Sequence, residues 1–360
     1  VVFWGTFFPL ISEAVTGTKA SVGPPWFDRY TVPLALILVL LSGIGPVIAW
    51  RRATLVNARR NFRAPIAAAL VAAVALLAAG GTASHPLALA MFCAAAFVAT
   101  SVFQEFWRGT RARQAMSGER PAAALVSLVR RNRRRYGGYL VHVGVAVLFV
   151  GVAASSSFRN ESELSLSPGQ STQVGAYTVR YVRPTANVLT DPKHTGSTLD
   201  IGAVLDVSRH GHHVATLSPS RGYYDSNDPS QGSVGHFIGG EAVSHVGLSA
   251  GPLRDFWSAI EPNLAAPDLQ RYVSIGNQKI PLVRPDAGLL AIALMARHYL
   301  QHPPPAQFHF LDSPLVTWIW LGGLIVFGGG LIALWPLPAR VRRRVRSAYS
   351  APVARGLGRA

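Results

Sequence analysis

One histidine lies inside an apolar stretch that has the character of a membrane span. His142 belongs to the run YLVHVGVAVLFVGVAA (139–154), which directly follows the basic tract RRNRRRYGG (130–138). An ionisable side chain within a span is costly to bury and is a candidate functional residue. A neutral imidazole is a common ligand of haem iron, so ligation is one interpretation of His142. A hydrogen bond to a neighbouring helix is the alternative, and this residue alone does not separate the two.

The elements that would position His142 are apolar segments of spanning length. Hydrophobic residues make up 49% of the 360-residue chain and charged residues only 14%. A spanning helix needs about 17–25 predominantly apolar residues. Segments of this kind are expected at 31–50, 64–80, 87–107, 138–155 and 313–336.

Two features precede the first of these spans. Residues 1–12 are apolar but too short to cross a membrane, and no initiator Met is present. We therefore expect a truncated membrane helix there, in a chain that is a fragment or one half of a split protein. Residues 13–30 are expected to form an extracytoplasmic loop stiffened by Pro24 and Pro25. Its aromatic residues would anchor the loop at the membrane interface or contact a ligand or partner: Trp26, Phe27 and Tyr30.

The distribution of charge predicts the topology. The net charge is +17, and arginines concentrate in segments 51–63, 108–137 and 337–360, where Glu119 is the one acidic residue. The positive-inside rule places these segments, including the C-terminal tail, in the cytoplasm and residues 156–312 outside it. Because the arginines lie next to spans and no RNA-binding signature is present, we expect no nucleic-acid partner.

The region 156–312 is expected to be a β-rich domain, either a small sandwich or an open barrel. Short alternating runs rich in β-branched residues are divided by Gly, Pro, Asn and Asp. RHGHHV (209–214) is typical of a hairpin turn, and 287–300 has the pattern of an amphipathic helix at the membrane surface. The residues expected to be buried are Val174, Tyr177, Val179, Tyr181, Ile201, Val204, Leu205 and Val214. The fold class is thus an α-helical polytopic membrane protein with an inserted extracytoplasmic β-rich domain.

Other reactive side chains give weaker signals. His210, His212 and His213 cluster on the expected hairpin, but a polar hairpin tip accepts histidines without a metal, so we expect an exposed, metal-free tip. Cys93 lies within a span and has no partner cysteine in the chain. GxSxG, Walker and HExxH motifs are absent from the sequence, so it does not support hydrolytic or nucleotide chemistry. The remaining extracytoplasmic histidines are expected to be solvated or hydrogen-bonded loop residues: His194, His236, His245, His298, His302 and His309.

Several separated segments resemble one family in collinear order. They are GTFFPL (5–10) with SVGPPWFDRYTVP (21–33), NRRRYGGYLVHVGVAVLFVG (132–151), SPLVTWIWLGGLIVFGGG (313–330) and, more loosely, SRGYYDSNDPSQGSVGHFIGGEAV (220–243). Together they resemble the C-terminal half of CcmF, the haem-handling subunit of the bacterial cytochrome c maturation machinery called System I.

The resemblance implies a function and its partners. CcmF proteins receive haem from a periplasmic haem chaperone and promote its attachment to apocytochrome c, which a thiol-presenting partner helps to deliver. They also hold a haem b in the inner membrane between two transmembrane histidines, and His142 matches the second of these ligands. The family's proposed mechanism has this haem b reduce the iron of the transient substrate haem. No catalytic residue is implied within this chain.

The chain departs from the family in one respect. The family's WWD segment, its two flanking periplasmic histidines and the first transmembrane ligand all precede the region of resemblance, and no WW pair occurs here. This chain would then supply half of the haem b site and, alone, would not be a competent holocytochrome c synthase. Its partners would include the missing N-terminal half that carries the WWD segment.

Two other functional classes stay open at this point. A haem exporter or other transporter would tend to show internal repeats and broken helices around intramembrane charges. The expected spans show no evident repeat, and His142 is their one strong intramembrane ionisable group, although Glu105 lies near a span end. A non-catalytic membrane scaffold for cytochrome assembly would dock partners through the β domain and would bind no haem.

Overall fold

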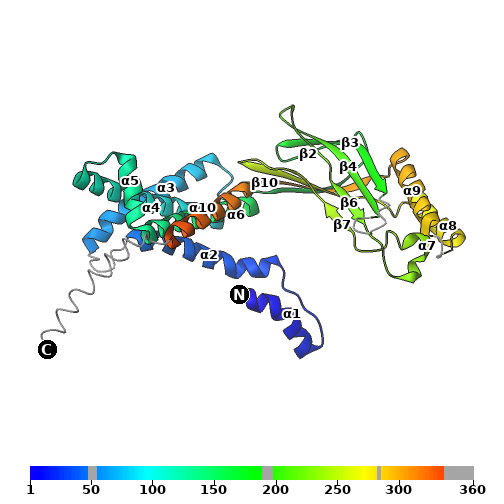
Figure 1. The fold of residues 1–360 in the computed structure, drawn as a ribbon, viewed down its shortest axis with the longest axis horizontal. Helices are drawn as coiled ribbons and strands as arrows, with labels where there is room; N and C mark the ends of the chain where they lie inside the picture. Colours follow the sequence, from blue (N-terminus) through cyan, green and yellow to red (C-terminus); the bar gives the residue numbers. More distant parts are fainter. Residues whose placement is uncertain (48–54, 189–197, 282–284, 336–360) are drawn as a thin grey trace. The chain divides into compact units, whose positions relative to one another are not determined.

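The chain divides into two compact units, one helical and one built mainly of strands (Figure 1). The structure, a computed structural model, describes residues 1–47, 55–188, 198–281 and 285–335. The helical unit comprises Val1–Ala153 and Trp318–Ala360, and the second unit comprises Ala154–Thr317. The expected basic tail 337–360 lies outside the described residues.

The helical unit is that of a multi-pass membrane protein. Within the described residues, five helices are long and apolar enough to cross a membrane. Their apolar residues form an internal cluster that includes Val39, Val98, Tyr136 and Ala146, while many other apolar side chains are exposed on the outside, as a lipid environment permits. The helices are α1 (Val2–Thr16), α2 (Pro24–Val47), α3 (Leu55–Ala79), α4 (Pro86–Ser117), α5 (Pro121–Arg131), α6 (Arg133–Ser157) and α10 (Val316–Leu334).

The structure corrects the expected loop 13–30. Helix α1 continues to Thr16, and α2 begins at Pro24, inside the expected loop. Pro24 and Pro25 begin α2 and do not stiffen a loop, because the N–H groups in the first turn of a helix have no intrahelical partner and proline is tolerated there. Only the short stretch between Thr16 and Pro24 connects the two helices.

The second unit contains two antiparallel sheets that share one core. One sheet has the order β1-β10-β9-β8, and the other has the order β2-β3-β4-β6-β7, with β5 also paired to β4. Buried side chains from both sheets pack together, among them Tyr181, Leu205, Phe256 and Phe308. The strands are β1 (Asn160–Leu166), β2 (Ser171–Val174), β3 (Tyr177–Val188), β4 (Leu199–Arg209), β5 (His212–Leu217), β6 (Ser220–Tyr223), β7 (Val243–His245), β8 (Gly247–Ser249), β9 (Arg254–Glu261) and β10 (Ala306–Pro314). The expected β-rich domain is confirmed.

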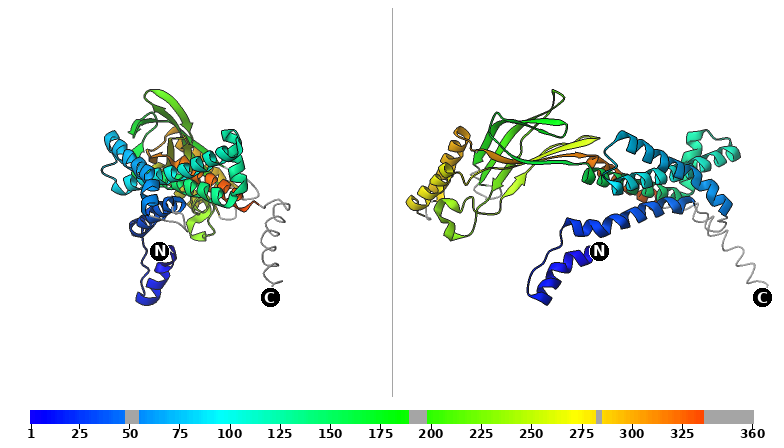
Figure 2. Two further views of the ribbon diagram at one scale, coloured as in Figure 1. Left: turned by 90° about the vertical axis from the view of Figure 1, so that its left-hand side faces the viewer. Right: turned by 180° about the vertical axis from the view of Figure 1, so that it is seen from behind.

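Three helices cover one end of the larger sheet (Figure 2). They are α7 (Gly232–Gly235), α8 (Pro267–Lys279) and α9 (Pro285–Gln301). Leu199 and Ile201 of β4 pack against Ile292 and Tyr299 of α9. The helix expected along the membrane surface at 287–300 therefore exists as α9, but its buried face packs on the sheet.

Most of the residues expected in the β core are buried, with two exceptions. Val174, Tyr177, Val179, Tyr181, Ile201 and Leu205 are all buried. Val204 is half-buried, and Val214 is 44% exposed. The pairing of β4 with β5 shifts between Val207 and Ser208, so Val214 is the extra residue of a β-bulge. The bulge reverses the alternation of β5 and turns Val214 outward.

Two buried tyrosines predict an alkaline limit to the stability of this unit. Tyr181 on β3 and Tyr299 on α9 are fully buried; burial raises the pKa of Tyr181 to about 12 and raises the pKa of Tyr299 further. The neutral phenol is favoured in the folded state, so this contribution is complete below about pH 10 and is lost as pH rises through the folded pKa values. We expect unfolding by urea to become easier above about pH 10, by up to about 1.4 kcal/mol per pH unit for each buried tyrosine.

Circular dichroism of the full chain in detergent measures this pH dependence. The Tyr299→Phe variant should unfold with a shallower dependence on pH, whereas Tyr224→Phe, at a half-buried position, should behave like the parent. The same alkaline slope in Tyr299→Phe and the parent would contradict the assignment.

Candidate functional site

His142 lies on α6, where its neighbours in the sequence are apolar. It is half-buried, and its imidazole forms no hydrogen bond or ion pair with any residue that the structure describes. Tyr136, Tyr139 and Ala146 of the same helix pack in the cluster with α2 and α4. The expected alternative, a hydrogen bond to a neighbouring helix, is therefore not formed within the described part of the chain.

A seam of glycines joins α6 to α10 on another side of α6. A Cβ on Gly144 would lie 2.7 Å from the backbone nitrogen of Val326, and one on Gly137 would lie 2.7 Å from the carbonyl oxygen of Gly329. Gly322 of α10 approaches Gly144 in the same way. Each residue turns an α-helix by about 100°, so Gly137 and Gly144 lie about 140–160° around the helix from His142. Gly144 therefore serves close helix packing, and the side of α6 that carries His142 is separate from this seam.

The glycine seam predicts a sharp difference between two adjacent positions. Gly322→Val should push α10 away from α6, because a Cβ there meets the backbone of Leu148 and Gly144. Overpacking of this kind costs about 1–3 kcal/mol. The matched control is Gly323→Val, since a Cβ on Gly323 has no atom within 4 Å. Size-exclusion chromatography after heating in detergent measures how much of each variant stays monodisperse. An equal loss of monodisperse protein in both variants would contradict this account of the seam.

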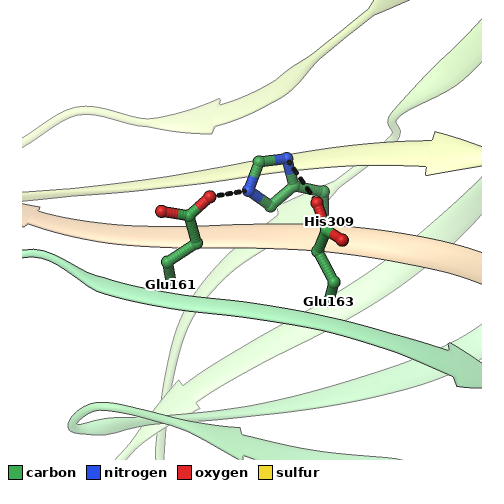
Figure 3. Close-up of side chains that lie close together, drawn as sticks. All are labelled: Glu161, Glu163 and His309. Atoms are coloured by element: carbon green, nitrogen blue, oxygen red, sulfur yellow. Dashed lines mark hydrogen bonds and ion pairs between the residues drawn. The ribbon is translucent and has the colours of Figure 1, made fainter. Parts of the chain in front are cut away.

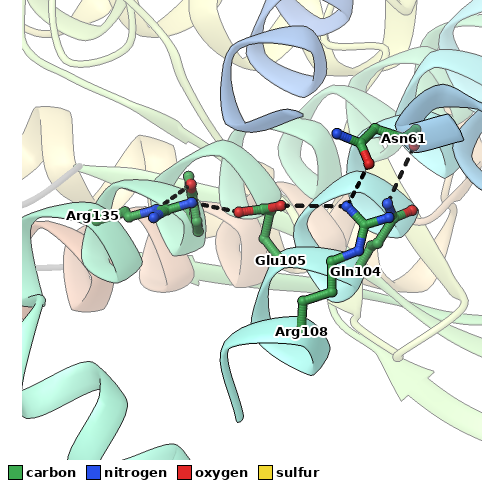
Figure 4. A network of polar contacts seen from close by, with 6 residues as sticks. Asn61, Gln104, Glu105, Arg108 and Arg135 are labelled. Carbon is green, nitrogen blue, oxygen red and sulfur yellow. Dashed lines mark hydrogen bonds and ion pairs between the residues drawn. The ribbon is translucent and has the colours of Figure 1, made fainter. Parts of the chain in front are cut away.

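A polar network ties α3, α4 and α6 together (Figure 4). Arg135 donates to Glu105 at 2.5 Å and to the Tyr139 hydroxyl at 2.6 Å. Arg108 lies 3.9 Å from Glu105 and donates to the Asn61 side chain at 2.8 Å. Glu105, the acidic group near a span end, is thus held by two arginines, and this network provides no unpaired acid beside His142.

The aromatic residues at the start of α2 pack against α1. The Trp26 ring lies 5.1 Å from those of both Phe27 and Tyr30, measured between centroids. The Phe27 ring also fills the space in which a side chain at Gly5 would stand. Tyr30 is 45% exposed, so this cluster has both a packed side and an accessible side.

The histidine-rich segment 209–214 forms the predicted hairpin turn. His210 and Gly211 have φ values of 50° and 79°, the left-handed conformation that tight hairpins require. His213 Nδ1 lies 2.6 Å from an oxygen of Asp206, and all three histidines are exposed. In the part of the chain that the structure describes, no third metal-ligating group joins this pair. The metal-free tip stays a prediction.

The sequence predicts that the other extracytoplasmic histidines lie in loops, but three of them lie in strands or helices. His245 ends β7, His298 lies in the last turn of α9, and His309 lies within β10. His309 meets Glu161 and Glu163 of β1 (Figure 3). No local pattern predicts this cluster, because strand pairing brings together residues that are 148 positions apart. His194 lies outside the described residues.

Comparisons with known proteins confirm the resemblance expected from the sequence. A Pseudomonas aeruginosa protein named cytochrome c-type biogenesis protein CcmF is 27% identical over 350 residues, which is 96% of this chain and 43% of that protein. Cytochrome c-type biogenesis protein CycK of Rhizobium meliloti is 26% identical over 353 residues, 96% of this chain and 42% of that protein. No family model matches the chain.

A solved structure has the same fold. The chain named cytochrome c haem lyase CcmF matches with a TM-score of 0.59 and 22% sequence identity, over 93% of this chain and 43% of that chain. This chain therefore spans less than half the length of the relatives that it matches. Such coverage is consistent with the C-terminal half to which the motifs pointed.

Proposed function

We propose that this chain is a haem-handling membrane subunit of cytochrome c maturation. The observation that carries the proposal is the similarity along 96% of the chain to proteins named for cytochrome c biogenesis. The five spanning helices and the inserted β unit agree with such a subunit. Its place is the bacterial inner membrane, with residues 156–312 outside the cytoplasm and the C-terminus inside, because the arginine-rich segments follow the positive-inside rule.

His142 is proposed as one axial ligand of a haem b. The fit rests on a half-buried imidazole that has no hydrogen bond to the described residues, on a side of α6 that the glycine seam does not occupy. A ring nitrogen in this setting is available to iron. Bound there, a haem b would supply one-electron chemistry to keep the transient substrate haem ferrous. The second ligand would come from the part of the relatives' length that this chain does not cover.

The partners follow from the same proposal. They are a periplasmic haem chaperone, apocytochrome c with its thiol-presenting partner, and the region of the relatives that carries the WWD segment. The β unit offers them a stable extracytoplasmic surface without disulfides, since the chain has a single cysteine. The holocytochrome c synthase reaction would belong to the assembled complex.

Spectra and cytochrome assembly together test the proposal. The chain should be expressed with the companion region of a relative in a bacterium that lacks its own cytochrome c maturation proteins. We expect a b-type absorbance spectrum in the purified complex and covalent haem on a c-type cytochrome in the cells. Haem export without covalent attachment would favour the transporter, and assembly without bound haem would favour the scaffold. Absence of both haem binding and attachment would overturn the proposal.

A further inference from the structure

The outer face of the smaller sheet carries three metal-ligating side chains on adjacent strands (Figure 3). In the register of β1 with β10, Glu163 stands directly opposite His309, and Glu161 opposite Leu311. Leu166 and Phe308 point to the other face and lie in the core. The alternation of a strand therefore presents Glu161, Glu163 and His309 together on a rigid, outward-facing surface.

The distances within this cluster suit a shared ligand. His309 Nε2 lies 2.8 Å from Glu161 Oε1, and Nδ1 lies 3.9 Å from Glu163 Oε1, a separation too long for a hydrogen bond. One donor atom from each residue lies within 4.8 Å of the others. Two ligands of one tetrahedral zinc ion lie about 3.4 Å apart, given metal–ligand distances of about 2.0–2.2 Å. The two carboxylates face different ring nitrogens, so an ion bound to Nε2 beside Glu161 requires the Glu163 side chain to rotate toward that nitrogen, which its 65% exposure allows.

Neighbouring residues orient the cluster. Arg159 lies 3.2 Å from the second oxygen of Glu161, which directs the first oxygen toward His309. Trp257 of β9 packs edge-on against the imidazole, with 5.4 Å between ring centroids. The indole on one side and the carboxylate on the other restrict the imidazole ring. Less side-chain conformational entropy is therefore lost when an ion binds.

We propose that Glu161, Glu163 and His309 form a binding site for a divalent transition-metal ion of the zinc class. One imidazole nitrogen and one oxygen from each carboxylate would bind the ion, and water would complete the tetrahedron. The two carboxylates balance the charge of the ion, and the nitrogen donor distinguishes the site from the all-oxygen sites that calcium and magnesium prefer. The alternative is an imidazolium ion paired with two glutamates, without a metal.

Calorimetric titration of the full chain in detergent with zinc chloride tests the proposal. We expect one zinc ion per chain and at least about tenfold weaker binding in the variants His309→Ala, Glu161→Gln and Glu163→Gln. Zinc should also raise the unfolding temperature of the parent but not of His309→Ala. Cobalt chloride should give the intense visible absorbance of a tetrahedral site, and millimolar calcium should not compete.

Two features keep the test decisive. Glu163→Gln conserves the shape of an exposed side chain, so its circular dichroism should match that of the parent. His213→Ala is the matched control, since His213 pairs with a single carboxylate, Asp206, on the exposed hairpin. Zinc binding lost in His213→Ala and kept in His309→Ala would overturn the proposal in favour of the hairpin. Absence of zinc binding by the parent, or calcium binding independent of His309, would leave only an ion-pair cluster.

Discussion

Replacing His142 by alanine should abolish the b-type haem spectrum of the complex assembled from this chain and the companion region. The imidazole is proposed as an axial ligand, and the methyl side chain of alanine has no atom that can bind iron. A lost interhelical hydrogen bond would cost only about 0.6–2 kcal/mol, and His142 makes none with the described residues. Since the glycine seam lies on another side of α6, the helices should still pack and insert. Absorbance at equal protein concentration measures the loss.

Two controls separate ligation from packing. Val145→Ala, one turn further along α6, removes apolar volume at a half-buried position and should retain the haem. Imidazole added to the His142→Ala complex should restore a b-type spectrum, because the truncated side chain leaves room for the free ligand. Full haem content in His142→Ala without added imidazole would remove this residue as a ligand.

The Arg254→Ala substitution should destabilise the β unit more than the loss of any exposed ion pair. Asp312 is fully buried and accepts two hydrogen bonds from Arg254, at 2.8 Å and 2.7 Å. Removing the guanidinium leaves a buried carboxylate whose remaining side-chain partner among the described residues is the Asn160 amide, at 3.3 Å. A buried charge stripped of its counter-ion costs about 3–5 kcal/mol. Urea unfolding of the full chain, followed by circular dichroism, measures the difference.

The control for this prediction is another arginine of the same unit. Arg221 lies 3.6 Å from Glu261, whose side chain is 67% exposed, and Arg221→Ala should cost no more than about 1 kcal/mol. A combined Arg254→Leu and Asp312→Leu variant should recover part of the loss, because no charge then remains buried. Equal losses of unfolding free energy in Arg254→Ala and Arg221→Ala would show that the buried pair stabilises the β unit no more than an exposed pair does.

The spans and the core alternation could be predicted because each depends on a local pattern. Apolar length identified α2, α3, α4, α6 and α10 as membrane helices, and period-two burial identified Tyr177, Val179 and Tyr181. Val204 lies in a continuous apolar run, IGAVL, in which alternation leaves the inward residues undefined. Alternation predicts that Val214 is buried, because nothing in the local sequence signals the bulge in the pairing of β4 with β5.

Contacts between distant segments could not be predicted. The pattern of α9 shows that one of its faces is buried, but a helix that packs on a sheet and a helix that lies on a membrane present the same pattern. The close approach of Gly144 to Gly322 likewise joins two helices that are far apart in the chain, and the sequence around Gly144 does not specify this partner. The cluster of Glu161, Glu163 and His309 depends on the register of β1 with β10, which neither strand specifies alone.

The pairing of β1 with β10 has a consequence for how such a protein can evolve. Asn160 at the start of β1 is the register partner of Asp312 near the end of β10, so the chain enters and leaves the β unit on neighbouring strands. An insertion whose two ends lie side by side can be gained, exchanged or shortened without pulling apart the helices that flank it. The exposed positions of the strands between these ends are therefore free to diverge and acquire new surface chemistry, while the glycines of α6 and α10 remain constrained by their backbone contact.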